Sequence, residues 1–246
     1  NNKGKATDFG EDHYFEILKK CLHIEKTIDR HMEIMDKYDP EKRVALAFDE
    51  WGTWYDVEPG TNPGFLFQQN SMRDALVAAL TLNYLNAKCE RVRMANIAQT
   101  VNVLQALIFT EGDQMVLTPT YHIYDMYQVH HDAILLPQAL KTPDYSFGSE
   151  SLPAISASAS MDKEGRVHLS LVNIDPGKEV SVEVEITGKE SGKVTGQVLS
   201  SSQMDSHNSF AKADEVIPEE FNGARFRKGK LELTMPAHSV VVLQLD

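Results

Sequence analysis

The unbroken apolar run VALAF, residues 44–48, constrains the fold more than any other segment. A strand with one solvated face alternates apolar and polar residues, whereas a run without alternation is typical of a strand covered on both faces in a parallel sheet. A second strand is predicted at residues 91–98, where Arg91 and Arg93 are expected only to frame the strand entrance. The long stretch between the two strands predicts a helical crossover and therefore parallel neighbours.

Three helices are predicted around these strands. Apolar side chains recur at steps of three and four over residues 15–35, which indicates an amphipathic helix. Ser71 and Asp74 resemble a capping box that opens a second helix, and the apolar middle of that helix indicates cover on two sides. A third helix is expected over residues 101–112, with a glycine at its end.

From about residue 113 the pattern changes to short strands, several of them strictly alternating, separated by turn residues such as Pro176-Gly177. This pattern is typical of an antiparallel β-sandwich. One helical turn is expected at residues 121–129. We therefore expect two domains, an α/β segment over residues 1–112 and an all-β antiparallel sandwich over residues 113–246. The strands are predicted at 154–161, 167–174, 180–187, 193–200, 230–235 and 239–245.

Two parallel strands cannot form a stable sheet alone, because their apolar faces and edges stay exposed. The remaining strands are therefore expected from sequence outside this chain or from a second chain. The N-terminal stretch NNKGKATDFGEDHYFE has no initiator methionine, basic segment or apolar leader, so the chain is interpreted as a fragment or a processed product. Its location is left open, since cytoplasmic, periplasmic and secreted proteins all fit.

Charge and composition exclude several classes of function. The formal net charge of −12 argues against nucleic acid as a partner, which requires a basic surface. No run of 18 apolar residues occurs, so no membrane partner is expected. Cys21 and Cys89 lack the spacing of zinc ligands and are expected to be buried free thiols. No serine nucleophile elbow, phosphate-binding loop or dinucleotide-binding fingerprint is present.

Two adjacent carboxylates end the first strand. Asp49 and Glu50 are followed by Trp51 and Trp54, the two tryptophans of the chain. In β/α barrels the catalytic groups lie where strands end, and strict alternation would put the two carboxylates on opposite sides. Tryptophan rings stack on sugars and exclude water, and a carboxylate beside them can act on an anomeric carbon. The plainer alternative is a helix cap or a solvated corner.

A family resemblance covers about residues 44–137. The segment AFDEWGTWYDVEPGTNPGFLFQQNSMRDALVAALTLNYLN, followed by RVRMANIAQTVNVLQALIFTEGDQMVLTPTYHIYDMYQVHHDAILLP, resembles the α-L-arabinofuranosidases of glycoside hydrolase family 51. The resemblance implies that residues 1–112 are the C-terminal part of an eight-stranded β/α barrel. It also implies a retaining enzyme that releases terminal α-L-arabinofuranosyl groups from arabinose-containing oligosaccharides or polysaccharides, with no metal and no organic cofactor.

Site residues follow from this resemblance position by position. Glu50 in DEW matches the catalytic nucleophile, Gln99 in NIAQ matches a residue that contacts arabinose, and Trp54 matches an aromatic on the leaving-group side. Asp49 and Trp51 are expected to support the nucleophile without touching the sugar.

The sequence departs from the family pattern at two points. Gly52 stands where many members have asparagine, and the smaller residue is expected to widen or loosen the rim of the site. The family's acid/base glutamate follows an asparagine on an earlier strand, but no Asn-Glu dipeptide occurs here. The missing N-terminal part of the same enzyme is therefore the expected partner, and the intact enzyme is expected to be a homo-oligomer. The chain alone is expected to be inactive.

Other readings of the residues carry less weight. His122, His130, His131 and Asp132 suggest a metal cluster, but adjacent histidines diverge, so no metal site is expected. The tyrosines nearby are expected to pack between the two halves. A second class of function is a non-catalytic carbohydrate-binding or assembly module, which the absence of tryptophan from the sandwich disfavours.

Overall fold

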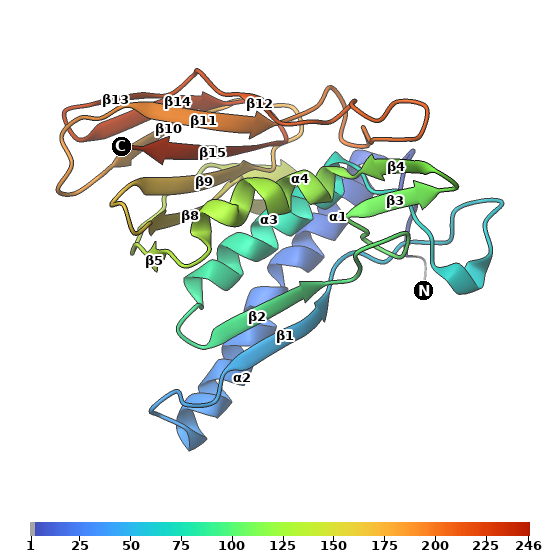
Figure 1. Cartoon of the computed structure of the whole chain (residues 1–246), viewed down its shortest axis with the longest axis horizontal. Helices are drawn as coiled ribbons and strands as arrows, with labels where there is room; N and C mark the ends of the chain where they lie inside the picture. The colour runs from blue at the N-terminus through green and yellow to red at the C-terminus, as the bar shows by residue number, and fades with distance from the viewer. Residues whose placement is uncertain (1–2) are drawn as a thin grey trace.

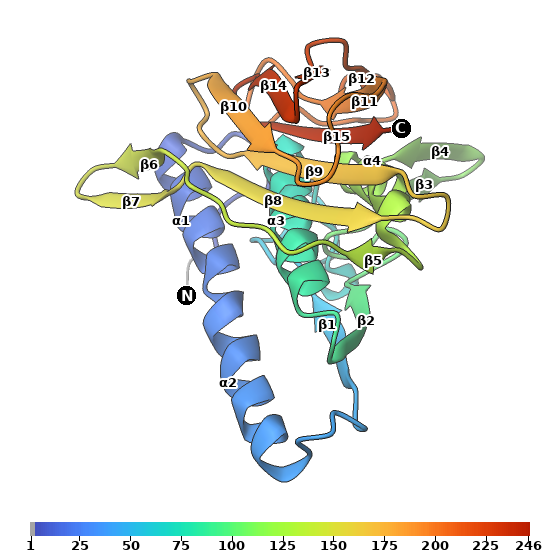
Figure 2. The same ribbon diagram turned by 90° about the vertical axis from the view of Figure 1, so that its left-hand side faces the viewer.

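The computed structural model describes residues 3–246, which form three layers (Figure 1). A sandwich of antiparallel strands lies at one end, helices lie beneath it, and a two-stranded parallel sheet lies beyond the helices. Figure 2 shows the same order after a 90° turn, with the N-terminal helical segment running from the sandwich past the parallel sheet. The architecture is therefore a mixed α/β segment followed by antiparallel sheets, as predicted.

The N-terminal apolar stripe forms two consecutive helices rather than one. Helix α1 spans Glu11–Leu22 and α2 spans Ile24–Tyr38, with His23 between them. The stripe faces the core, because the buried side chains of these helices are Tyr14, Phe15, Leu18, Ile28 and Met32.

The two predicted strands near the N-terminus pair in parallel, as β1 (Leu46–Trp51) and β2 (Val92–Ile97). One face of this pair is covered, since Phe48 packs against the core that includes the helices. The other face is open, and Ala47 and Met94 are exposed on it. Cover on both faces, which the VALAF run predicts, is therefore not found within residues 3–246.

Helix α3 (Met72–Ala87) forms the centre of the helix layer. The predicted capping box is present, because Asp74 accepts a hydrogen bond from the Ser71 backbone N–H at 2.8 Å while the Ser71 side chain caps the helix. Residues 75–80 are all buried, which confirms the predicted cover on more than one side.

The helix predicted over residues 101–112 is wrong. The chain instead forms a folded loop and then a hairpin of β3 (Ile108–Glu111) and β4 (Gln114–Leu117). Asn102 has a positive φ of 58°, which a right-handed helix does not contain. Gly112 also has a positive φ, 59°, and lies in the two-residue turn of the hairpin. A glycine that would suit a helix end suits this turn equally well.

Three short helical segments complete the helix layer and its loops. The first, η1 (Pro63–Phe65), lies between β1 and α3. The helical turn predicted at residues 121–129 is longer than expected and consists of α4 (Pro119–Met126) followed by η2 (Tyr127–His130). Helix α4 packs on α3.

The sandwich contains a six-stranded sheet of order β12-β11-β15-β9-β8-β5 and a three-stranded sheet of order β10-β14-β13. All six strands predicted for this half are present, and the shorter strands were not predicted. The hairpin β6-β7 stands apart. The bounds are β5 (Ile134–Leu135), β6 (Asp144–Phe147), β7 (Glu150–Pro153), β8 (Ile155–Met161), β9 (Val167–Asn173), β10 (Val180–Glu185), β11 (Val194–Leu199), β12 (Glu219–Glu220), β13 (Arg225–Arg227), β14 (Lys230–Met235) and β15 (Ser239–Leu245).

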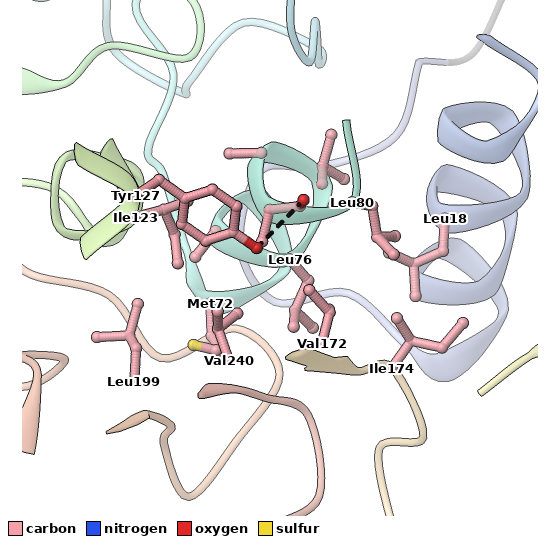
Figure 3. Packing of buried hydrophobic residues seen from close by; sticks show 14 of the residues in the cluster. Leu18, Met72, Leu76, Leu80, Ile123, Tyr127, Val172, Ile174, Leu199 and Val240 are labelled. Carbon is pink, nitrogen blue, oxygen red and sulfur yellow. Dashed lines mark hydrogen bonds between the residues drawn. The ribbon is translucent and has the colours of Figure 1, made fainter. Parts of the chain in front are cut away.

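Two hydrophobic cores lie on opposite faces of the six-stranded sheet. Leu171 of β9 belongs to the core between the two sheets, and its neighbour Val172 belongs to the core against the helices. This alternation follows from the strand period of two. Figure 3 shows the helix-side core, where Leu76 of α3 lies among side chains from α1, α4 and the sheet, including Leu18, Ile123 and Val172.

The serines of β8 join the sheet to the helix layer. Asn83 and Asn86 of α3 donate hydrogen bonds to Ser156 and Ser158, at 3.1 and 3.2 Å. The alanines between these serines pack against the core on the other face. The sequence AISASASM therefore places a polar stripe on the helix-facing side of β8.

The expected domain boundary at residues 112 and 113 lies in the turn of the β3–β4 hairpin and stays a prediction. The helix-side core contains residues from both sides of it. No helix within residues 3–246 is long and apolar enough to cross a membrane.

Arg91 joins the start of β2 to the end of α2 and is fully buried. Its guanidinium donates to Asp36 at 3.0 Å, to the Asp39 carboxylate at 3.2 Å and to the Val44 carbonyl at 2.8 Å. The pKa of Asp39 falls to about 2, mainly because the Val44 backbone N–H donates to it and also because Arg91 does. Arg91 therefore fixes the turn that leads into β1, a more specific role than the framing of the strand entrance expected from the sequence.

Replacing Arg91 by alanine is expected to lower the free energy of unfolding by about 3 kcal/mol, because Asp39 would keep a charge without its buried partner. Arg93→Ala is the matched control, since Arg93 is exposed on the same strand; its change should stay within about 0.5 kcal/mol. Denaturant unfolding of both variants measures the difference. Equal stability of the two variants would contradict the role given to Arg91.

Candidate active site

A β-bulge ends the strand that carries the two carboxylates. Phe48 of β1 pairs with Ala95 of β2 and Trp51 pairs with Ile97, so two residues on β1 face one on β2. Strict alternation therefore fails at this point. Asp49 and Glu50 are the two bulge residues that lie opposite Asn96, and both carboxylates are exposed.

The two carboxylates differ in their hydrogen bonds within the part of the chain that the structure describes. Asn96 of β2 donates its side-chain N–H to Asp49 at 2.9 Å. Glu50 has no side-chain hydrogen bond or ion pair to another residue in the part of the chain that the structure describes. This arrangement agrees with the expectation that Asp49 supports and Glu50 reacts, although both roles stay predictions.

Trp51 and Trp54 lie in different environments. Trp51 is 6% exposed and its ring stacks on Tyr124 with centroids 6.4 Å apart, so it supports the strand end from the core. Trp54 is 50% exposed, with the Lys3 ammonium 3.6 Å from its ring centroid. Of the two tryptophans, Trp54 is therefore the one whose ring is exposed.

Gln99 lies at the matching end of β2. The Ala98 backbone N–H donates to the Trp51 carbonyl at 2.8 Å, which aligns the two strand ends. The peptide bond between Ala98 and Gln99 is cis, and the Gln99 side chain is exposed. The two residues with the most direct expected roles are thus Glu50, near the end of β1, and Gln99, just after β2, at the same edge of the sheet.

Gly52 allows a close approach between the two strand ends. Its φ of +139° is a conformation that side chains disfavour. A Cβ atom there would lie 3.3 Å from Oε1 of Gln105 and 3.4 Å from the Ala98 carbonyl oxygen. The missing side chain at Gly52 therefore lets Gln105 and Ala98 approach the backbone closely, and the expected widening of the rim stays a prediction.

A buried polar network below the rim was not predicted. The Asp74 carboxylate accepts hydrogen bonds from the hydroxyls of Thr53 and Tyr55, both at 2.8 Å, in addition to its capping bonds. Burial, followed by the nearby Asp74 charge, raises the pKa of Tyr55 well above its usual value. Arg73 lies over the Tyr55 ring, 4.1 Å from its centroid. The capping-box pattern indicated only the local part of this network.

A cavity of about 660 Å³ lies between the N-terminal helices, α3 and the segment after β1. Its lining includes Trp51, Trp54, His23 and Cys21. Burial raises the pKa of the Cys21 thiol to about 11, so this thiol is protonated at neutral pH and a poor nucleophile. Cys21 is therefore a packing residue of the cavity wall.

The candidate metal residues do not meet. Among residues 3–246, no group of three His, Cys, Asp or Glu side chains is placed to hold a metal ion. His130 contacts the hydroxyls of Ser160 and Ser170 at 2.7 and 2.6 Å, and burial is the main cause that lowers its pKa to about 4. The expected packing of the tyrosines is confirmed for Tyr127, which is buried and donates to Asn83 of α3 at 2.9 Å.

Comparison with known proteins assigns the family. The sequence profile of the α-L-arabinofuranosidase C-terminal domain matches residues 49–239. An intracellular exo-α-L-arabinofuranosidase of Bacteroides ovatus is 43% identical over 246 residues, covering 100% of this chain and 48% of the relative. The chain belongs to the α-L-arabinofuranosidase family.

Solved structures agree with this family. The arabinofuranosidase of glycoside hydrolase family 51 from Xanthomonas axonopodis pv. citri superposes with a TM-score of 0.98 at 46% identity, covering 100% of this chain and 50% of that one. A family 51 α-L-arabinofuranosidase from Bifidobacterium longum, at 24% identity, shares the fold with a TM-score of 0.81, covering 95% of this chain and 49% of that one. The chain spans about half the length of these relatives and corresponds to their C-terminal portion.

Gly52→Ala is expected to lower the free energy of unfolding by about 2 kcal/mol, because the backbone conformation is strained for alanine and its Cβ would crowd Gln105. Gly177→Ala is the control, since a Cβ at Gly177 would meet nothing within 4 Å. Thermal unfolding compares the two variants. An unchanged melting temperature of the Gly52 variant would show that the close approach is unimportant.

Proposed function

We propose that this chain carries the nucleophile half of a retaining α-L-arabinofuranosidase active site, with Glu50 as the nucleophile. The observation that carries the proposal is the bulge in β1, which leaves Glu50 exposed without a side-chain partner among the described residues, directly before the buried anchor Trp51. The substrates are terminal α-L-arabinofuranosyl groups of oligosaccharides or polysaccharides. Membership of the family supports this choice of sugar.

The reaction needs two carboxyl groups, about 5–5.5 Å apart in retaining enzymes. Glu50 attacks the anomeric carbon, and the bond from that carbon to the leaving oxygen breaks while an acid donates a proton to this oxygen. The same group then removes a proton from water, which attacks the anomeric carbon and releases Glu50. The Trp54 ring would cover the leaving group and exclude water.

The second carboxyl group is proposed to come from sequence outside this chain, because no Asn-Glu dipeptide occurs within it. The open face and open edge of the β1–β2 pair support this proposal. Within the described residues β1 pairs only with β2, and two parallel strands do not form a stable sheet alone. We place β1 and β2 as the last two strands of an eight-stranded barrel, with Asp49 and Asn96 on its inner face.

The 246-residue chain alone is expected to show no turnover of a nitrophenyl α-L-arabinofuranoside, because protonation of a leaving group requires the acid that it lacks. The full-length enzyme is the positive control under the same conditions. Robust turnover by the isolated chain would contradict the proposal that the acid/base lies outside it.

Glu50→Ala in the full-length enzyme is expected to lower kcat at least about 10⁴-fold, because the covalent intermediate cannot form. Added azide should restore cleavage of an activated substrate and give a glycosyl azide of inverted configuration. Glu111→Ala, which changes an exposed carboxylate of the β3–β4 hairpin, should leave kcat unchanged. Retention of activity in the Glu50 variant would reject the nucleophile assignment.

A further inference from the structure

Gln105 lies at the point where the two strand ends, α3 and α4 converge. It belongs to the loop after β2 and is fully buried. The sequence pattern did not predict the structural role of this residue, because it indicated a helix over residues 101–112.

The first contact of Gln105 fixes the loop that follows Glu50. Its Oε1 accepts the backbone N–H of Thr53 at 2.9 Å. Gly52 makes room for this bond, since a Cβ at Gly52 would lie 3.3 Å from the same oxygen. The segment that follows Trp51 therefore packs closely against the side-chain amide of Gln105.

The second contact reaches the segment that carries Gln99. The Gln105 backbone N–H donates to the Ala98 carbonyl at 2.9 Å, next to the Ala98 N–H that donates to Trp51. One residue thus bonds through its side chain to the segment after β1 and through its backbone to the segment after β2.

The remaining contacts anchor the amide to two helix N-termini. Gln105 Nε2 donates to the Asp74 carbonyl of α3 at 2.8 Å and to the Thr120 hydroxyl of α4 at 3.2 Å. Asp74 and Thr120 are themselves fully buried. Both hydrogens and the oxygen of the amide are used, so rotating the amide by 180° would set donor against donor at Thr53 and acceptor against acceptor at Asp74.

We propose that Gln105 is a positioning residue for the reaction, which holds the end of β1 so that Glu50 meets the anomeric carbon at attacking distance. It touches neither the substrate nor Glu50 and acts through Thr53 and Gly52. The inference rests on the proposed nucleophile role of Glu50. Its physical basis is that a displacement of a reacting group by about 1 Å is enough to slow a reaction strongly.

Gln105→Met in the full-length enzyme keeps the length of the side chain and removes its three hydrogen bonds. Assayed well below its melting temperature, this variant is expected to lose at least about tenfold in kcat on a nitrophenyl α-L-arabinofuranoside, with KM within about twofold of the parent. Hydrogen exchange at residues 52–55 should become faster, because the Thr53 N–H loses its acceptor.

Asn83→Leu is the matched control. Asn83 is an equally buried amide whose partners, Ser156 and Tyr127, lie between α3 and the sandwich, away from the strand ends. It is expected to lower the melting temperature as Gln105→Met does, but to leave kcat and exchange at residues 52–55 at parental values. An equal loss of kcat in both variants, or no loss in Gln105→Met, would overturn the positioning role.

The exchange measurement separates this inference from the proposed function. If Glu50→Ala keeps its activity, the nucleophile assignment fails, and with it the catalytic purpose of Gln105. Faster exchange at residues 52–55 in Gln105→Met would then still show that Gln105 holds the strand end. Unchanged exchange would reject the inference even if Glu50 proves to be the nucleophile.

Discussion

The burial of α3 is the constraint on which the rest of the structure depends. Its apolar side chains contact α1 and α4, and one face of the six-stranded sheet packs against them. Its first turn also holds the segment that follows β1, because Asp74 accepts hydrogen bonds from Thr53 and Tyr55. A helix buried on several sides cannot shift without disturbing each of these contacts, so the sandwich and the strand ends are mechanically connected through it.

At the strand ends, a side-chain hydrogen bond leaves Glu50 as the carboxylate without a side-chain partner among residues 3–246. The bulge between Phe48 and Trp51 exposes two adjacent carboxylates, and Asn96 binds only Asp49. Tryptophan on the core side and glycine at the turn then fix the path of the chain. The exposed position of Glu50 thus depends on the scaffold residues around it.

Local patterns predicted the features that depend on neighbours in sequence. The parallel strands, the capping box at Ser71 and the alternation in AISASASM could be predicted, because each reflects a period or a short spacing in the sequence. The bulge could not be predicted, since it depends on the register between β1 and β2. The hydrogen-bond network around Gln105 could not be predicted either, because its partners Thr53 and Thr120 are distant from it in sequence. The wrong helix at residues 101–112 shows that apolar spacing alone cannot exclude a loop with positive φ.

The polar stripe of β8 has a consequence for how this protein can be recombined. Hydrogen bonds from Asn83 and Asn86 to serines are directional, so they add a requirement for matching register to the apolar packing between helix and sheet. A sandwich transplanted from a distant relative would bury these amides without acceptors unless its own strand offered hydroxyls at the same positions. The two halves are therefore expected to be inherited and exchanged together, as one unit of variation rather than two.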